Sequence, residues 1–127
     1  MTPIQTILCP TDFSQSSRAA VDYAIELAKL LHAKLRLLNV FEPQPLEVDA
    51  AAPELSGQVI SVIEAESKER LAAEQKRVSA TGVEVTSELA VGSPARVIAE
   101  LSSQVQLIVL SSHGRTGLAH LLMGSVT

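Results

Sequence analysis

The stretch Leu107-Ile-Val-Leu-Ser-Ser-His-Gly-Arg-Thr-Gly117 decides the expected fold of this chain. Its first four residues are all apolar, which predicts a short strand over 107–110 that is buried on both faces. Small residues and glycines occupy most of 111–117, so the backbone is expected to turn sharply where this strand ends. A strand buried on both faces is typical of a parallel sheet that carries helices on either side.

Strand and helix patterns alternate along the rest of the chain. Three further strands are expected, over 4–9, 34–40 and 83–89, and three helices, one after the N-cap Ser14, one over 58–81 and one opened by Ser93-Pro94. Residues 41–57 are expected to form a loop, because prolines and a glycine interrupt them. The alternation predicts one α/β domain over 1–127, a single doubly wound parallel sheet with helices on both faces.

Composition narrows the function classes. The 127 residues carry a net charge of -4, which argues against binding to a nucleic-acid backbone, and the lack of tryptophan argues against base-stacking platforms. A single cysteine, Cys9, excludes an internal disulfide framework and a multi-cysteine zinc site. No apolar run is long enough to span a membrane, and the first residues lack the features of a signal peptide. We therefore expect a cytoplasmic protein with no membrane partner.

Two polar segments follow strands that are expected to be central. Pro10-Thr11-Asp12-Phe13-Ser14 comes after the strand over 4–9, and 111–117 comes after the strand over 107–110. If these strands are neighbours, both segments line the crevice where ligands bind in such sheets. Asp12 would then accept a hydrogen bond from an amino or hydroxyl group of a ligand. The alternative is a turn aspartate that caps the following helix, but Ser14 is available for that role.

The segment after residue 110 has the features of a phosphate site. Glycines let the backbone approach a ligand closely, and Gly124-Ser125 is expected to open another helix, whose first N–H groups favour an anion. Ser125 and Thr127 would add hydroxyl donors. An ordinary turn is the alternative for the glycines of 111–117. The segment is neither a P-loop nor a dinucleotide fingerprint, since both of those glycine patterns are absent.

The spacing of these residues resembles that of a known family. Ser111-x2-Gly114-x9-Gly124-Ser125 is similar to the G-x2-G-x9-G-[S/T] pattern in ATP-binding members of the universal stress protein (UspA-like) family. The segments 10–14, 91–94 and 112–117 also resemble that family, and the resemblance extends from Ile4 to Thr127. It implies a Rossmann-like fold of the adenine nucleotide alpha hydrolase type.

The resemblance also implies a nucleotide site. Asp12 and the backbone of Val40, with the neighbouring Pro10 and Thr11, would hold the adenine and ribose end, and Leu110 and Ser111 would line the ribose. Around the phosphates it places Gly114, Arg115, Gly124, Ser125, Val126 and Thr127. Charge-assisted hydrogen bonds from Arg115 would offset the repulsion between ATP and an acidic chain.

Ser111 departs from the family pattern, which has glycine at this position. If a positive φ is required there, serine costs roughly 1 kcal/mol; if only a small side chain is required, serine fits and adds a hydroxyl group. The function that the resemblance implies is a stress-response module that binds ATP or AMP and signals through its nucleotide-bound state. The alternative is a dimerisation or interaction domain of the same fold, in which Ser111 marks a degraded site.

The family normally continues with a further helix and a fifth strand that pairs across a homodimer. We therefore expect the sequence to be a shortened version of a longer chain, truncated after the Gly-Ser-Val-Thr motif at 124–127. Without those elements the strand over 107–110 would present an exposed apolar edge, which folded proteins avoid. A homodimer is the partnership that the resemblance implies.

No residue has the features of a dedicated catalytic group, so we expect a protein that is not an enzyme, with at most slow, incidental ATP hydrolysis. Mg²⁺ could accompany the phosphates, held mainly by phosphate oxygens and water. The three histidines lack carboxylate or cysteine neighbours at ligand spacing, which argues against a metal site of the protein itself. A Ser-His-Asp hydrolase is disfavoured because no nucleophile elbow is present.

Overall fold

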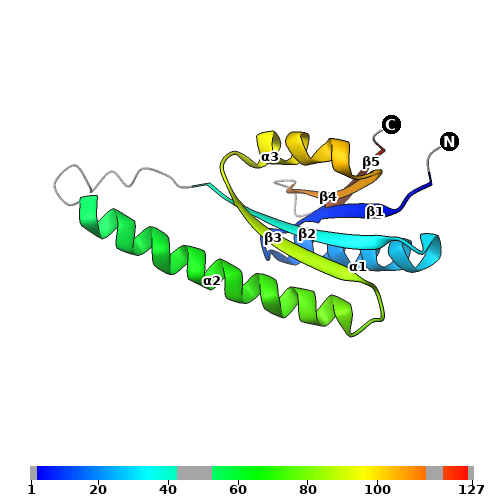
Figure 1. Cartoon of the computed structure of the whole chain (residues 1–127), viewed down its shortest axis with the longest axis horizontal. Coiled ribbons are helices and arrows are strands. Elements are labelled where there is room, and N and C mark those ends of the chain that lie inside the picture. Colours follow the sequence, from blue (N-terminus) through cyan, green and yellow to red (C-terminus); the bar gives the residue numbers. More distant parts are fainter. Residues whose placement is uncertain (1–2, 43–52, 114–118, 126–127) are drawn as a thin grey trace.

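The computed structural model describes residues 3–42, 53–113 and 119–125, which form a five-stranded sheet in the order β3-β2-β1-β4-β5 (Figure 1). The strands are β1 Thr6–Pro10, β2 Lys34–Phe41, β3 Val85–Val91, β4 Leu107–His113 and β5 Ala119–Ser125. The helices are α1 Gln15–Leu31, α2 Pro53–Ser79 and α3 Pro94–Leu101, and a short 3-10 helix follows over Ser102–Gln104. Strands β1 to β4 run parallel, which confirms the predicted α/β fold.

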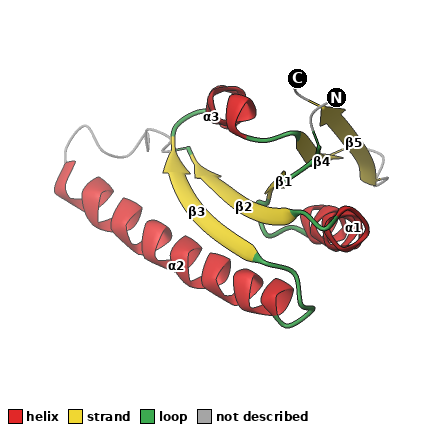
Figure 2. Cartoon of the chain, turned by 45° about the vertical axis from the view of Figure 1, so that its right-hand side comes forward, coloured by secondary structure: helices red, strands yellow, loops and turns green. Residues whose placement is uncertain are grey.

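The two faces of the sheet are covered by different helices: α1 and α2 lie on one face and α3 lies on the other (Figures 1 and 2). Side chains of each central strand alternate between them. Ile7, Leu37 and Val109 belong to the larger hydrophobic cluster, with α1 and α2. Leu8 and Leu38 belong to the smaller cluster, with α3. This alternation explains why the central strands have continuous apolar runs.

Helix α2 begins earlier than expected. The structure places Pro53 at its first position, whereas the sequence predicts a loop through residue 57. Proline suits the first turn of a helix, because its fixed φ is helical and its missing N–H has no partner there in any case. The rest of the expected loop, 43–52, lies outside the described residues. No helix in the described part of the chain is both long and apolar enough to cross a bilayer.

The region near the C-terminus differs from the expectation. Residues 119–125 form β5, which pairs antiparallel with β4, so the prediction that Gly124-Ser125 opens a helix is wrong. The expectation that β4 has an exposed edge is also wrong, because β5 pairs with that edge. The physical reason is that an edge strand offers a row of unpaired N–H and C=O groups, and a neighbouring segment satisfies them by pairing.

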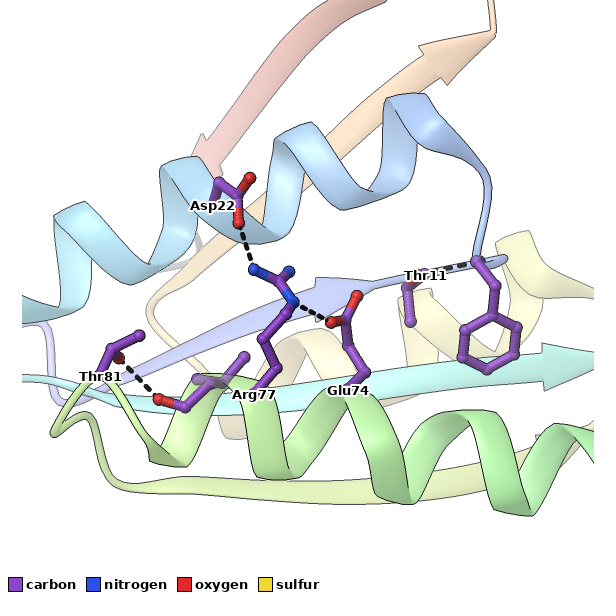
Figure 3. A network of polar contacts seen from close by, with 7 residues as sticks. Thr11, Asp22, Glu74, Arg77 and Thr81 are labelled. Atoms are coloured by element: carbon purple, nitrogen blue, oxygen red, sulfur yellow. Dashed lines mark hydrogen bonds and ion pairs between the residues drawn. The ribbon is translucent and has the colours of Figure 1, made fainter.

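A polar network joins the two helices on the larger face. The Arg77 guanidinium on α2 donates to Asp22 Oδ1 on α1 at 2.7 Å and to Glu74 Oε1 within α2 (Figure 3). Hydrogen bonding to Glu74 raises the pKa of Arg77 above its usual range, so the guanidinium stays charged. The Glu74 side chain is only 12 % exposed, so it depends on Arg77 for compensation of its charge.

We expect Arg77→Leu to lower the free energy of unfolding by about 2 kcal/mol, because it leaves the Glu74 carboxylate poorly solvated and unpaired. Chemical denaturation measures this loss. Arg70→Leu is the matched control, because Arg70 pairs with Glu66 on the exposed side of the same helix. Its effect should stay below about 0.5 kcal/mol. Equal losses in the two variants would contradict a structural role for the network.

Candidate functional site

A cavity of about 250 Å³ lies at the carboxyl ends of β1 and β4, where the winding of the sheet reverses. Its lining residues come from the ends of β1, β2 and β4 and from the starts of α1 and α3: Pro10, Thr11, Asp12, Ser17, Leu38, Val40, Pro94, Ile98, Leu110 and Ser111. The predicted adjacency of the two polar segments is therefore confirmed for residues 10–12 and 110–111. Most of the wall is apolar, and the polar groups gather around Asp12.

Backbone hydrogen bonds hold the segment after β1 against β2. The Thr11 amide donates to the carbonyl of Leu38 at 2.8 Å, and the Asn39 side chain donates to the carbonyl of Thr11 at 2.8 Å. Asn39 is buried, so its amide group needs such a partner. Sequence reasoning did not use Asn39, although a polar residue inside an apolar strand was a visible signal. These bonds fix the point at which the chain leaves the sheet.

The turn into α1 uses an uncommon backbone conformation. Phe13 has a φ of 66°, and its amide donates to Thr11 Oγ1 at 3.0 Å (Figure 3). A left-handed φ in a bulky residue is rare and is maintained only where the surrounding contacts require it. Here it reverses the chain so that α1 starts beside the cavity.

Asp12 has the turn-stabilising role that the sequence offered as one alternative, and it also lies at the cavity, where the ligand role stays a prediction. Its Oδ1 accepts from the Ser14 amide at 2.9 Å and from Ser17 Oγ at 2.6 Å. Ser14 is the N-cap of α1, and its own side chain accepts from the Ser17 amide. The carboxylate therefore stabilises the turn and also lines the cavity, at an exposed position that a ligand can reach.

Ser111 lies in the regular backbone of β4. Among the described residues other than glycine, only Phe13 and His32 have a positive φ, so serine is unstrained at position 111. Its Oγ lies 3.5 Å from Ser17 Oγ, at the cavity wall. The structure therefore favours the interpretation that position 111 requires only a small side chain and not a positive φ. The Ser111 hydroxyl lies beside the other polar groups of the cavity.

The wall opposite the polar edge comes from the approach to α3. Gly92 has a φ of 142°, and its amide donates to the carbonyl of Phe41 at 2.9 Å. This φ lies in the range that L side chains rarely adopt, so the tight turn requires glycine. This turn brings Pro94 and Ile98 over the cavity.

Sequence reasoning missed four lining residues: Ser17, Leu38, Pro94 and Ile98. Ser17 had a visible signal, because it interrupts the otherwise apolar inner face of α1, which continues with Ala20, Val21 and Ala24. The others are apolar residues whose pattern indicates only burial.

The predicted phosphate contacts are placed differently. Gly124 pairs with Ile108 and Ser125 pairs with Leu107. Leu107 precedes Ser111 by four residues along β4, about 13 Å in a strand. In this arrangement the structure does not bring Gly124 and Ser125 to the cavity. Gly114, Arg115, Val126 and Thr127 lie outside the described residues.

Cys9 precedes Pro10 in β1 and is fully buried in the larger hydrophobic cluster, on the α1 and α2 face of the sheet. Burial, and then the negative charge of Glu74, raises the pKa of its thiol from 9.0 to about 12. Within the described ranges, no group of three or more His, Cys, Asp or Glu side chains is arranged to hold a metal ion. Its burial makes Cys9 part of the hydrophobic core.

We expect the Cys9 thiol to react with a thiol reagent only after the protein unfolds. Its raised pKa means that the folded state retains the proton more tightly than the unfolded chain, so the contribution to stability is complete below pH 9 and is lost as the pH rises toward 12. Cys9→Ala should therefore show a smaller alkaline loss of stability than the parent protein. Rapid labelling of the native parent would contradict this expectation.

Taken together, the mostly parallel sheet and the cavity at its winding reversal define an α/β protein with a crevice at the carboxyl edge of the sheet. The sequence model of the universal stress protein family matches residues 3–127. The chain belongs to the universal stress protein family.

Individual relatives agree with this assignment. The chain is 33 % identical to universal stress protein MJ0531 of Methanocaldococcus jannaschii, over 94 % of this chain and 71 % of the relative. The solved structure of protein MJ0577 matches with a TM-score of 0.75 at 25 % identity, over 92 % of this chain and 80 % of that one. A universal stress protein solved in complex with cAMP matches with a TM-score of 0.63 at 24 % identity, covering 84 % of this chain and 72 % of that one.

Proposed function

We propose that the cavity binds the nucleoside part of an adenine nucleotide, ATP or AMP, and that the protein acts in the stress response through its nucleotide-bound state. The observation that carries this proposal is the pairing of an apolar wall with a single polar edge. Val40, Ile98 and Leu110, which are partly exposed, offer surfaces for the faces of a purine ring, and the buried Leu38 supports them from below. Asp12 offers an acceptor for the amino group of adenine or for ribose hydroxyls.

The size of the cavity supports a nucleoside rather than a larger ligand. Its volume of about 250 Å³ lies just below the roughly 300 Å³ at which typical small-molecule pockets begin. The phosphates would therefore extend beyond the cavity, past Ser111. Arg115 and Gly114 follow Ser111 closely in the sequence and are the phosphate contacts that we propose, and any Mg²⁺ would be held mainly by phosphate oxygens and water.

We propose binding rather than turnover. Asp12 is the only ionisable side chain among the described residues that line the cavity. Acid–base catalysis of phosphate hydrolysis needs a base or a water-positioning group near the γ-phosphate, whereas Asp12 lies at the proposed nucleoside end. Hydrolysis of ATP is therefore expected to be slow compared with release of the nucleotide.

The test combines two measurements on the protein purified without added nucleotide. Mass spectrometry of the released ligand should detect ATP or AMP, and calorimetric titration of ligand-free protein should give micromolar affinity for ATP. GTP serves as the base control and cAMP as the ring-closed phosphate control. An empty protein that binds none of these would overturn the proposal.

The alternative, a dimerisation domain with a degraded site, gives a different result with Ser111→Gly. A degraded site should gain affinity for ATP substantially, whereas the strain-free backbone of Ser111 predicts a change of less than about threefold. Light scattering with and without ATP tests the homodimer that we also propose. A large gain from glycine together with a nucleotide-independent dimer would favour the alternative.

A further inference from the structure

Ser17 has contacts that an ordinary helix residue does not need. It lies in the first turn of α1 with only 4 % of its surface exposed, and it lines the cavity. Its Oγ donates to Asp12 Oδ1 at 2.6 Å and accepts from the Asp12 amide at 3.3 Å. One hydroxyl group therefore contacts both the backbone and the carboxylate of the same residue.

The hydroxyl has one proton, which sets the direction of the remaining contact. Because that proton goes to Asp12, Ser17 can only accept from Ser111 Oγ, which lies 3.5 Å away. The hydroxyl groups thus form a chain from Ser111 through Ser17 to Asp12. This chain links the end of β4 to the turn after β1, across the floor of the cavity.

Asp12 also accepts a hydrogen bond from the Ser14 amide, but an exposed aspartate held by fewer bonds samples more side-chain rotamers. Ordering it on ligand binding would then cost conformational entropy and weaken the affinity. Together with the Ser14 amide, the bond from the buried Ser17 hydroxyl restricts the Asp12 side chain before the ligand arrives.

We propose that Ser17 is a positioning residue: its hydroxyl holds the Asp12 carboxylate in the orientation that a donor group of the nucleoside requires. This inference rests on the proposed function and deepens it, because it attributes the polar contribution to nucleotide affinity to two residues, Asp12 and Ser17. Ser17 acts on the ligand through Asp12.

The first test compares calorimetric affinities for ATP in three variants. Ser17→Ala should lower the affinity about tenfold, as expected for one hydrogen bond to a charged group. Ser17→Thr keeps the hydroxyl and should bind within about threefold of the parent. Ser14→Ala is the matched control, because it removes the side-chain N-cap bond of α1 but keeps both the backbone amide of residue 14, which donates to Asp12, and the Ser17 hydroxyl. It should lower the melting temperature without changing the affinity.

A double-mutant cycle tests whether Ser17 acts through Asp12. In the Asp12→Ala background, Ser17→Ala should change the ATP affinity less than about twofold. In the parent protein, the same substitution should lower the ATP affinity about tenfold. Equal losses in the two backgrounds would overturn the proposal, because Ser17 would then act independently of Asp12.

A measurement without ligand separates this inference from the proposed function. NMR couplings that report χ1 of Asp12 should show one rotamer in the parent protein and in Ser17→Thr, and averaging in Ser17→Ala. A single rotamer in Ser17→Ala would overturn the positioning role. If the parent protein binds no nucleotide, the proposed function fails, and these couplings still decide whether Ser17 holds Asp12.

Discussion

Asp12→Ala should lower the affinity for ATP about a hundredfold, the largest effect that we expect from a single side chain at the site. The substitution removes the proposed acceptor for the nucleoside, which the backbone amide of Ser14 and the hydroxyl of Ser17 hold in place. Hydrogen bonds to charged groups are worth about 1.5–3 kcal/mol each, so the loss of one ligand bond and its orientation accounts for this size. Isothermal titration with ATP measures it.

Two controls separate this contact from general electrostatics. Glu84→Ala makes the same change to the net charge of -4, but Glu84 pairs with Lys34 away from the cavity lining. Its affinity should stay within about twofold of the parent, because screened surface charges contribute little over that range. Asp12→Asn keeps the shape and one acceptor oxygen and should give an intermediate loss. Parent-like binding by Asp12→Ala would remove Asp12 from the site.

Leu37→Ala should destabilise the fold by about 3 kcal/mol and leave the ATP affinity unchanged. Leu37 is fully buried in β2 and belongs to the larger cluster, on the α1 and α2 face. Truncating such a side chain loses its burial and leaves a cavity, and the typical stability of a domain is only about 5–15 kcal/mol.

Leu38→Ala is the matched partner of that variant. Leu38 is also fully buried, but it points to the α3 face and lines the cavity. We expect a similar loss of stability, by about 3 kcal/mol, together with an affinity that falls about tenfold. Denaturation and titration of both variants measure the two effects separately. Equal affinities in the two variants would contradict the placement of the nucleoside on the α3 side of the sheet.

Much of the fold could be predicted because its signals are local. The apolar run at 107–110, the N-cap Ser14 and the Ser93-Pro94 helix start all lie where the structure has them. The rules for parallel sheets then bring the ends of β1 and β4 together, which places Asp12 and Ser111 at the same edge. The family resemblance, not the sheet rules, implied Val40 and Leu110, which also line the cavity. The family resemblance, confirmed over residues 3–127, points to the same edge of the sheet.

Two elements were not predicted from the sequence: the first turn of α2 and the strand β5. The start of α2 at Pro53 was missed because proline signals both a loop and the first turn of a helix. The strand at 119–125 was missed because its partner, β4, lies on another segment and offers backbone groups that no local pattern reveals. In both regions the local signal was ambiguous, and at 119–125 the pairing with β4 decided the outcome.

By itself, the sequence determined the order of the elements, the parallel core and the edge of the sheet at which Asp12 and Ser111 meet. These follow from hydrophobic periodicity, capping and chain connectivity, which depend on residues close together in sequence or on general rules of handedness. Only the tertiary structure decided that Ser17 holds Asp12, that Pro94 and Ile98 close the cavity, and that β5 covers β4. Those contacts join residues from separate elements, and their existence depends on side-chain direction and backbone pairing after the chain has packed.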